Sequence, residues 1–310
     1  MRQRIIIAGP TASGKSELAV QLAKHLKGEI ISVDSRQCYK HIDIGTAKPS
    51  PKQLQSVPHH NISVLELHEN DSVAAFKNRA EKYAEKIEQR GKIVIYCGGS
   101  TLHLQSIFHP LDNIPSSDKE NLKKLEQIAE EKGLEKLYEK LKNKDPEYAK
   151  KMDGLNKQRI FRALDVWMQT GKPFSSFHTR DDATLPENML FYALHHPRNI
   201  LHQRISDRTD RMFEQGLVQE TEHILESGID PSTQSLQTVG YREVIRYLEG
   251  SMTLVQAKKD IKTSTRRYAK RQITWLRRWP FVQWLNRHQT ATTKLVEKIS
   301  AQVAALSQKG

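Results

Sequence analysis

The chain has 310 residues, enough for one large α/β domain with an insertion or for two smaller domains, and in either case for a buried core. Lys and Arg number 49 against 36 Asp and Glu, and the net charge of +13 favours a polyanionic partner. Two cysteines exclude a disulfide framework, and the run of four apolar residues before the first glycine is too short for a signal peptide or a membrane span. We therefore expect a cytoplasmic protein without a membrane partner.

A glycine-rich loop follows the first apolar run, Ile5–Ala8, which predicts a buried strand. The loop matches the phosphate-binding pattern at every fixed position and reads Gly9, Pro10, Thr11, Ala12, Ser13, Gly14, Lys15, Ser16. In that pattern backbone N–H groups and a helix N-terminus converge on an anion, the lysine adds charge and the serine hydroxyl binds Mg²⁺. The loop predicts a phosphorylated ligand, with ATP as the first candidate and Mg²⁺ at Ser16. A plain glycine turn with a surface lysine is the alternative.

Further apolar runs at Ile30–Val33 and Ile93–Cys97 predict parallel strands, and Met189–Leu194 predicts a later one. Helices at Ser16–Leu26 and Ser72–Gln89 carry apolar residues at helical spacing and complete the βαβ units. We predict an α/β fold whose core is like that of the P-loop-containing nucleoside triphosphate hydrolases, with a parallel sheet and an inserted α-helical subdomain.

Polar segments follow the second and third strands, at Asp34–Gln37 and Gly98–Thr101. Because the carboxyl ends of parallel strands meet at one edge of a sheet, these segments and the glycine loop should lie together. There Asp34 could act as a base or a metal ligand, with capping of the next turn as the alternative. The third strand ends without the Mg²⁺-binding aspartate of many P-loop NTPases, which weakens the ATPase interpretation. Ser100 supplies a hydroxyl instead, unless this segment is a plain strand-to-helix turn.

The composition changes near residue 115. A Lys/Glu-rich stretch at Asp118–Lys151 and a segment at Gln158–Gln169 predict helices, the second ended by Gly171 and Pro173. We predict three parts: 1–114 as the first part of the core, 115–186 as a helical insertion, and 187–310 as the rest of the core with basic C-terminal helices. The last part has predicted helices at Asn199–Gln215, Val218–Ser227, Tyr241–Glu249 and Leu254–Trp279.

Arg204 and Arg208 lie one helical turn apart, so both guanidinium groups project from one face of a helix. They could clamp a diphosphate, or form an ordinary charged face with Asp207 and solvent. His59 and His60 have no further metal-type partners at suitable spacing, so we expect no zinc site.

The segment Lys258–Arg287 carries ten Lys and Arg against one acid, and three of the chain's four tryptophans. At helical spacing it forms two stripes, a basic one of Arg267, Lys270, Arg271 and Arg278 and an aromatic one of Tyr268, Trp275 and Trp279. One stripe can dock on the core while the other meets phosphates, which predicts a nucleic-acid partner. A solvated basic face and a membrane-surface helix are the alternatives.

A collinear set of segments between residues 9 and 275 resembles one known family. Besides the glycine loop, the segments are Ser32–Ser35, Asp43–Pro49, Pro58–His60, Gly98–Gly99, Gln158–Arg159, Arg162–Leu164, Thr170–Pro173, Val239–Arg242 and Ala269–Trp275. They make the chain similar to the bacterial tRNA dimethylallyltransferases, also called tRNA isopentenyltransferases or IPP transferases. Gly45–Pro49 and Ala269–Trp275 are far more specific to this family than the glycine loop.

The resemblance implies transfer of a dimethylallyl group from dimethylallyl diphosphate to N6 of the adenosine next to the anticodon, position 37 of tRNA. Because the lone pair of the exocyclic N6 is delocalised into the ring, a base must take its proton. The resemblance assigns that role to Asp34 and places Ser100, as a second catalytic residue, near the reacting diphosphate. The diphosphate would lie on the glycine loop with Mg²⁺, Lys15 and one of Arg204 and Arg208.

The resemblance also implies that the partner is the anticodon stem-loop of tRNA, held by the insertion and the basic C-terminal helix of a monomer. The implied RNA contacts are Asp34, Ser35, Arg36, Gln37, Gln158, Arg159, Ile160, Phe161, Arg162, Gln237, Thr238, Val239, Gly240, Tyr241, Arg242, Lys270 and Arg271.

The chain departs from the family pattern at Ser100 and His103, where a threonine and a tyrosine are usual, and also at Asp71 and Asp153–Asn156. These departures leave rate and substrate preference open. Three other functions stay open: a transferase that uses free adenylate, a P-loop nucleotide kinase or NTPase, and an RNA-binding protein with a vestigial loop.

Overall fold

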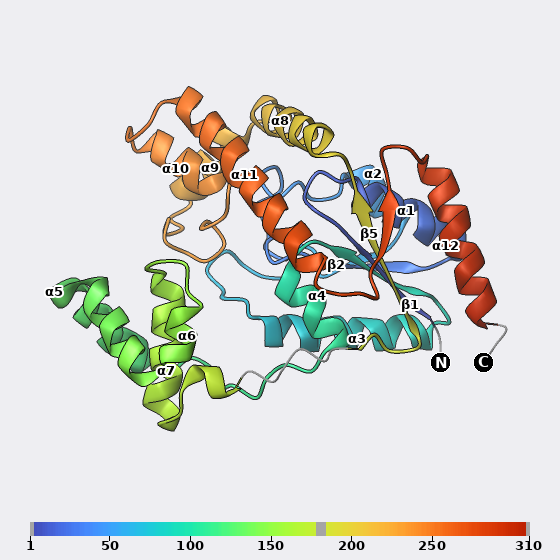
Figure 1. The fold of residues 1–310 in the computed structure, drawn as a ribbon. Helices are drawn as coiled ribbons and strands as arrows, with labels where there is room; N and C mark the ends of the chain where they lie inside the picture. Colours follow the sequence, from blue (N-terminus) through green and yellow to red (C-terminus); the bar gives the residue numbers. More distant parts are fainter. Residues whose placement is uncertain (1–2, 178–183, 308–310) are drawn as a thin grey trace. The chain divides into compact units, whose positions relative to one another are not determined.

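The computed structural model describes residues 3–177 and 184–307 and contains a six-stranded parallel sheet (Figure 1). The strand order is β3-β2-β4-β1-β5-β6. The strands are β1 Arg4–Ala8, β2 Glu29–Val33, β3 His59–His60, β4 Val94–Gly98, β5 Met189–His195 and β6 Gln283–Asn286. In the middle of the sheet, Ile6 of β1 pairs with Tyr96 of β4 and with Phe191 of β5. These central strands are mostly apolar and are buried except at their ends, because helices cover them on both faces.

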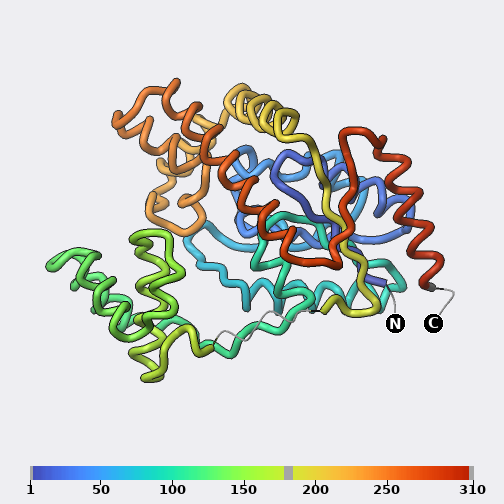
Figure 2. Tube along the Cα trace, viewed as in Figure 1, coloured from blue at the N-terminus to red at the C-terminus, as the bar shows by residue number. Residues whose placement is uncertain are grey.

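The helices around the sheet are α1 Lys15–Leu26, α2 Pro51–Ser56, α3 Val73–Gln89, α4 Thr101–Phe108, α8 Arg198–Glu214, α9 Leu217–Glu226, α10 Tyr241–Leu248, α11 Leu254–Leu276 and α12 Thr292–Ser307. Ile5 and Ile7 of β1 point to the face that α1 and α12 cover. On the other face, Phe108 of α4 packs edge-on against Phe191, with ring centroids 5.8 Å apart. The first and last helices therefore lie side by side (Figure 2).

A second hydrophobic core joins α8–α11 to the segment that follows β2. Tyr39 and Ile42 of that segment pack with Met212 of α8, Tyr241 of α10 and Ile261 of α11. The polar residues after β2 are held between this core and the carboxyl edge of the sheet.

The predicted strands are confirmed, and so are the predicted helices around the sheet, with one correction at the C-terminal end of α11. That helix ends at Leu276, so Arg278 and Trp279 lie beyond it, although Trp279 is buried as predicted. The predicted basic residues Arg267, Lys270 and Arg271 are exposed on the helix. Its buried face is Ala257, Ile261, Ala269, Gln272 and Leu276. Tyr268, predicted to dock on the core, is 36% exposed.

In the described parts of residues 1–109 and 184–310, five further elements were not predicted: α2, β3, α4, β6 and α12. Strands as short as β3 and β6 carry too few residues to show a period of two, and tertiary pairing alone reveals them. Helix α12 is amphipathic, and its apolar side packs against α1, a contact that its own sequence does not reveal.

Residues 110–183 form one compact unit, and residues 1–109 with 184–310 form the other. The predicted insertion is 115–186, of which 178–183 lie outside the described residues. The helices of the 110–183 unit are α5 Lys119–Lys144, α6 Pro146–Lys150, α7 Lys157–Thr170 and a 3₁₀ turn at Phe174–Phe177.

The stretch predicted as helical at Asp118–Lys151 is broken twice. Gly133, with φ at 79°, kinks α5, and Asp145 ends it. The buried Asp145 carboxylate accepts hydrogen bonds from Tyr148 N at 3.0 Å and Ser175 N at 2.7 Å, so it caps α6 and ties the 3₁₀ turn to it. Within the described ranges, no helix is long and apolar enough to cross a membrane.

Candidate active site

The glycine loop joins β1 to α1 and closes on itself. Gly9 has φ at 150° and Gly14 has φ at 89°, conformations that side chains rarely adopt. A Cβ at Gly9 would lie 2.9 Å from Ser13 Oγ and 3.3 Å from the backbone of Leu194 on β5, so a larger residue would push the loop off the sheet. The Lys15 ammonium donates to Pro10 O across the loop at 3.3 Å.

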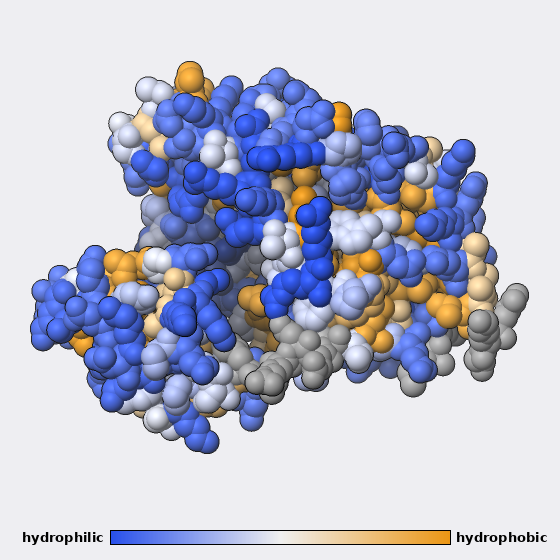
Figure 3. Space-filling view, viewed as in Figure 1, coloured by the Kyte–Doolittle hydropathy of each residue, from blue (hydrophilic) through white to orange (hydrophobic). Residues whose placement is uncertain are grey.

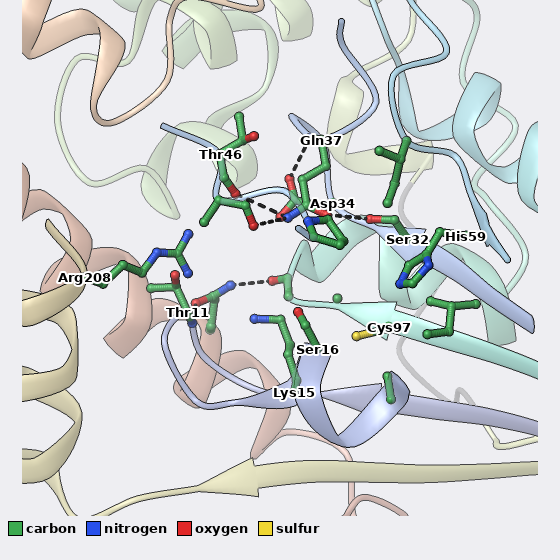
Figure 4. Close-up of a pocket in the computed structure, with 18 of the residues that line it drawn as sticks. Thr11, Lys15, Ser16, Ser32, Asp34, Gln37, Thr46, His59, Cys97 and Arg208 are labelled. Carbon is green, nitrogen blue, oxygen red and sulfur yellow. Dashed lines mark hydrogen bonds between the residues drawn. The ribbon is translucent and has the colours of Figure 1, made fainter. Parts of the chain in front are cut away.

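A pocket opens over this loop, and we call it the loop pocket (Figure 4). It lies at the carboxyl ends of β1, β2 and β4, as predicted for the ligand of a parallel sheet. Its lining is Thr11, Lys15, Ser16, Ala19, Ile30, Ser32, Asp34, Gln37, Thr46, Ala47, Pro49, His59, Ile62, Cys97, Gly98, Gly99, Arg208, Tyr268 and Gln272.

Two cations face this pocket. Burial lowers the pKa of Lys15, and the nearby Arg208 lowers it further, while Cys97 and Asp34 oppose the shift. Burial also lowers the pKa of Arg208, against the attraction of Asp34. Within the described ranges neither cation forms a salt bridge. Two desolvated cations at one loop indicate a site for an anion.

Asp34 follows β2 directly and lies in the same pocket (Figure 4). Its Oδ1 accepts from Arg36 N at 2.9 Å and Gln37 N at 3.3 Å. The alternative that Asp34 caps the next turn therefore holds, but it accounts for one carboxylate oxygen only. The turn fixes the carboxylate at the pocket, which leaves the second oxygen for chemistry.

A second pocket adjoins the first and shares Thr11, Asp34, Thr46, Arg208 and Tyr268 with it; we call it the side pocket. Its remaining lining comes from the turn after β2, from α8 and α11 and from the segment before α10: Ser35, Arg36, Gly45, Ile205, Thr209, Met212, Gln237, Thr238, Val239, Ile261 and Thr265. The carboxylate of Asp34 thus lies where the two pockets meet.

The structure separates the two candidate arginines. Arg208 lines both pockets, whereas Arg204 is exposed and its Nε donates to Ala12 O at 2.7 Å from outside the loop. Arg204 therefore supports the loop, and of this pair the predicted ligand contact falls to Arg208.

Ser100 is the N-cap residue before α4 and lines neither pocket. Its Oγ lies 2.9 Å from His103 Nδ1. Burial lowers the pKa of His103, whose ring packs against Phe76 at 4.6 Å between centroids. The hydroxyl predicted to be catalytic is thus engaged with a buried neutral histidine one helical turn away.

The residues implied as RNA contacts differ in exposure: some are exposed, some line the side pocket, and others are buried or bonded within the protein. Gln158, Arg159, Arg242, Lys270 and Arg271 are exposed, and in the space-filling view hydrophilic side chains gather over α11 (Figure 3). Ser35, Arg36, Gln237, Thr238 and Val239 line the side pocket.

Other implied RNA contacts are corrected by their burial. Ile160 and Phe161 belong to the core of the 110–183 unit, at 0% and 7% exposure. Tyr241 is fully buried, and its hydroxyl accepts from Gly45 N at 3.0 Å and donates to Glu220. These side chains hold helices in place, because a buried side chain offers no surface to a partner.

Gly240, Gln37 and Arg162 are occupied within the protein. Gly240 N donates to Glu243, and the Gln37 amide bonds Ser32 Oγ and the carbonyls of Thr46 and Ala47. The Arg162 guanidinium donates to Pro115 O at 2.6 Å and to the buried Asp165 at 3.3 Å.

Gln272 is a site residue that the sequence reasoning missed. It is 2% exposed on α11, its Oε1 accepts from Thr11 N at 2.9 Å, and its Nε2 donates to Gly99 O at 2.7 Å. A Cβ at Gly99 would lie 2.4 Å from that Nε2, which explains the glycine. One amide therefore joins α11 to the glycine loop and to the end of β4. The sequence did carry a signal for this role: Gln272 lies at helical spacing from Ala269 and Leu276, so it shares their buried face of α11.

We expect Gln272→Leu to lower the free energy of unfolding by about 2 kcal/mol, because two buried backbone groups lose their partners. The glycine loop would also move, and turnover should fall roughly tenfold. Gln272→Glu keeps an acceptor for Thr11 N but sets an oxygen against Gly99 O, so it should be equally damaging. Chemical denaturation and steady-state kinetics measure both effects, and unchanged values for Gln272→Leu would contradict the bridge.

Fold and site together define an α/β protein with a cationic glycine-loop pocket and a carboxylate at the edge of its parallel sheet. Within that class the chain belongs to the IPP transferase family, whose model matches residues 37–279. It is 44% identical over 297 residues to the tRNA dimethylallyltransferase of Carboxydothermus hydrogenoformans, with 95% of each chain covered.

Solved structures give the same relationship. The full-length tRNA isopentenylpyrophosphate transferase of Bacillus halodurans superposes with a TM-score of 0.73 at 33% identity, covering 99% of both chains. A eukaryotic dimethylallyltransferase acting on tRNA gives a TM-score of 0.81 at 29% identity, covering 98% of this chain and 80% of that one. The resemblance seen in the sequence is confirmed.

Proposed function

We propose that this protein transfers a dimethylallyl group from dimethylallyl diphosphate to N6 of the adenosine at position 37 of tRNA. The observation that carries the proposal is the meeting of two pockets at Asp34, one of them cationic. The names of the relatives, tRNA dimethylallyltransferase and tRNA isopentenylpyrophosphate transferase, support it. We further propose that the core is of the P-loop nucleoside triphosphate hydrolase type and that the helical unit at 110–183 is an insertion in it.

In the proposed reaction the loop pocket holds the diphosphate and the side pocket holds the adenine. The bond from the allylic carbon to the diphosphate oxygen breaks, and its electron pair leaves with the diphosphate. N6 bonds to that carbon, and the carboxylate of Asp34 takes the N6 proton. Lys15, Arg208 and the loop N–H groups stabilise the charge that develops on the diphosphate.

The residues present fit a Mg²⁺ ion beside the diphosphate. Ser16 and Asp34 line the same pocket, and Mg²⁺ is usually held by one or two protein oxygens, waters and substrate phosphates. In the part of the chain that the structure describes, no group of three or more His, Cys, Asp or Glu could hold a metal. We therefore propose Ser16 as the protein ligand, and the ion when bound would neutralise charge on the diphosphate.

We propose that the anticodon stem-loop contacts the exposed residues of the implied set, which are Gln158 and Arg159 on α7, Arg242 on α10, and Lys270 and Arg271 on α11. The net charge of +13 supports an RNA partner. The free cysteines Cys38 and Cys97 support a reducing, cytoplasmic setting, and we expect a monomer.

The decisive experiment incubates the protein with dimethylallyl diphosphate, Mg²⁺ and unmodified tRNA, and measures nucleoside masses. We expect one C5 unit on an adenosine next to the anticodon. Transfer to AMP in preference to tRNA would favour an adenylate isopentenyltransferase, and phosphate release from ATP would favour a kinase or NTPase. Absence of a product with every cellular tRNA would refute the proposal.

We expect Arg271→Ala to weaken tRNA binding and to reduce the slope of log K against log salt by about 1, because one phosphate contact is lost. Arg271 is exposed on α11 with its guanidinium 5.8 Å from the centroid of Tyr268. The KM for dimethylallyl diphosphate should not change. The control is Lys24→Ala, which removes an exposed cation on α1. Equal effects of the two substitutions would show that α11 is an ordinary solvated basic face and not an RNA contact.

A further inference from the structure

The loop pocket is cationic at one end and uncharged at the other, which we call the apolar end because the Ser32 hydroxyl beside His59 is engaged in donating to Gln37 Oε1. Arg208 and Thr11 lie at one end, His59 and Cys97 lie at the opposite end, and Lys15 and Asp34 lie between them (Figure 4). Ala19, Ile30 and Ile62 also line the pocket, and Ile30 is the strand partner of His59. No step of the proposed reaction uses this second end.

His59 reaches the pocket because β3 pairs with β2 and successive residues of a strand point to opposite sides. Its neighbour His60 points away, bonding Glu29 Oε2 at 2.7 Å and packing on Tyr83 with ring centroids 5.0 Å apart. Of these two adjacent histidines, only His59 lines the loop pocket.

The ring of His59 is fixed and uncharged. Its Nδ1 lies 2.9 Å from Val57 O, where it donates as an N–H. Burial lowers the pKa of His59, so the imidazole is neutral at neutral pH. A neutral ring held in one orientation can contact an apolar group without the cost of desolvating a charge.

We propose that this apolar end is the subsite for the prenyl chain and that the ring of His59 limits the chain to five carbons. The inference rests on the proposed function. With the diphosphate at Lys15 and the adenine entering past Asp34 from the side pocket, the apolar end remains for the hydrocarbon chain. The bonds broken and formed do not depend on chain length, so length is selected by space alone.

The test compares the protein with His59→Ala and the matched control His60→Ala. Each is given dimethylallyl diphosphate and geranyl diphosphate in competition, with unmodified tRNA, and the products are separated by mass. The ratio of C10 to C5 transfer should rise at least about tenfold in His59→Ala. Removing the ring makes room for a second isoprene unit, which then gains the contacts of several methylene groups. It should stay at the starting value in His60→Ala.

Binding is measured separately, so that the inference does not depend on turnover. Calorimetric affinities for geranyl and dimethylallyl diphosphate, relative to inorganic diphosphate, should converge in His59→Ala and, to a smaller extent, in Cys97→Ala, which removes the sulfur at the same end. The second variant serves if the first fails to fold. An unchanged preference for the C5 compound in a folded variant, in both transfer and binding, would overturn the inference. Loss of C5 transfer to tRNA already in the parent protein would refute the proposed function instead.

Discussion

Asp34→Asn should abolish prenyl transfer, with turnover falling roughly 100- to 10,000-fold, while the affinity for tRNA stays nearly unchanged. The amide cannot accept the N6 proton. It still offers an oxygen at Oδ1, which accepts from Arg36 N and Gln37 N, so the turn after β2 is retained. Asparagine therefore separates the chemical role of this side chain from its structural one.

The comparison needs a second carboxylate-to-amide change that alters net charge equally. Glu226→Gln, exposed on α9, provides it and should leave both turnover and binding as they were. Single-turnover kinetics and tRNA-binding titrations separate the two quantities. An Asp34→Asn protein that loses tRNA affinity in proportion to its activity would show that the carboxylate acts in binding and not as the base.

Lys15→Ala should lower kcat/KM for dimethylallyl diphosphate about 100- to 1,000-fold, because a buried cation that we propose stabilises the leaving diphosphate is removed. Arg208 remains in the pocket, so some activity should persist. The affinity for tRNA should not change, since Lys15 is within the loop pocket and does not line the side pocket. Isothermal titration with inorganic diphosphate measures the loss independently of the reaction, and unaltered diphosphate affinity would contradict the assignment.

The pH dependence of the parent protein gives a second test of Lys15. Burial, reinforced by Arg208, lowers its pKa, so the ammonium loses its proton at a lower pH than an exposed lysine does. For the free enzyme, kcat/KM for dimethylallyl diphosphate should therefore fall on the alkaline side below pH 10.5, the ordinary lysine value. In Lys15→Ala that alkaline limb should disappear.

Much of this site was visible in the sequence because its parts are local. The glycine loop is one continuous segment, and Asp34 follows an apolar run directly, so the carboxyl-edge rule for parallel sheets was enough to bring them together. The same rule brought Gly98 and Gly99 to the loop pocket but did not bring Ser100, because the turn into α4 directs its hydroxyl to His103.

Contributions to the site from residues distant in the sequence could not be predicted in this way. The spacing of Arg204 and Arg208 is the same whichever of them reaches the pocket, and the packing of α8 on α11 decides it. Ile160, Phe161 and Tyr241 lie in segments that the family resemblance assigns to RNA contact, yet their side chains belong to hydrophobic cores. A motif identifies a segment, and burial decides which of its side chains a partner can touch.

By itself, the sequence determined the parallel α/β core, the cationic glycine loop, the base candidate Asp34 and the family, because each depends on short-range patterns or on linear motifs. Only the tertiary structure decided that Gln272 ties α11 to the loop, that Asp34 stands between two pockets, and that His59 and not His60 lines one of them. The reason is physical: these relations join residues far apart in the chain, or depend on which side of a two-residue strand faces the pocket. Strand pairing and helix packing fix both.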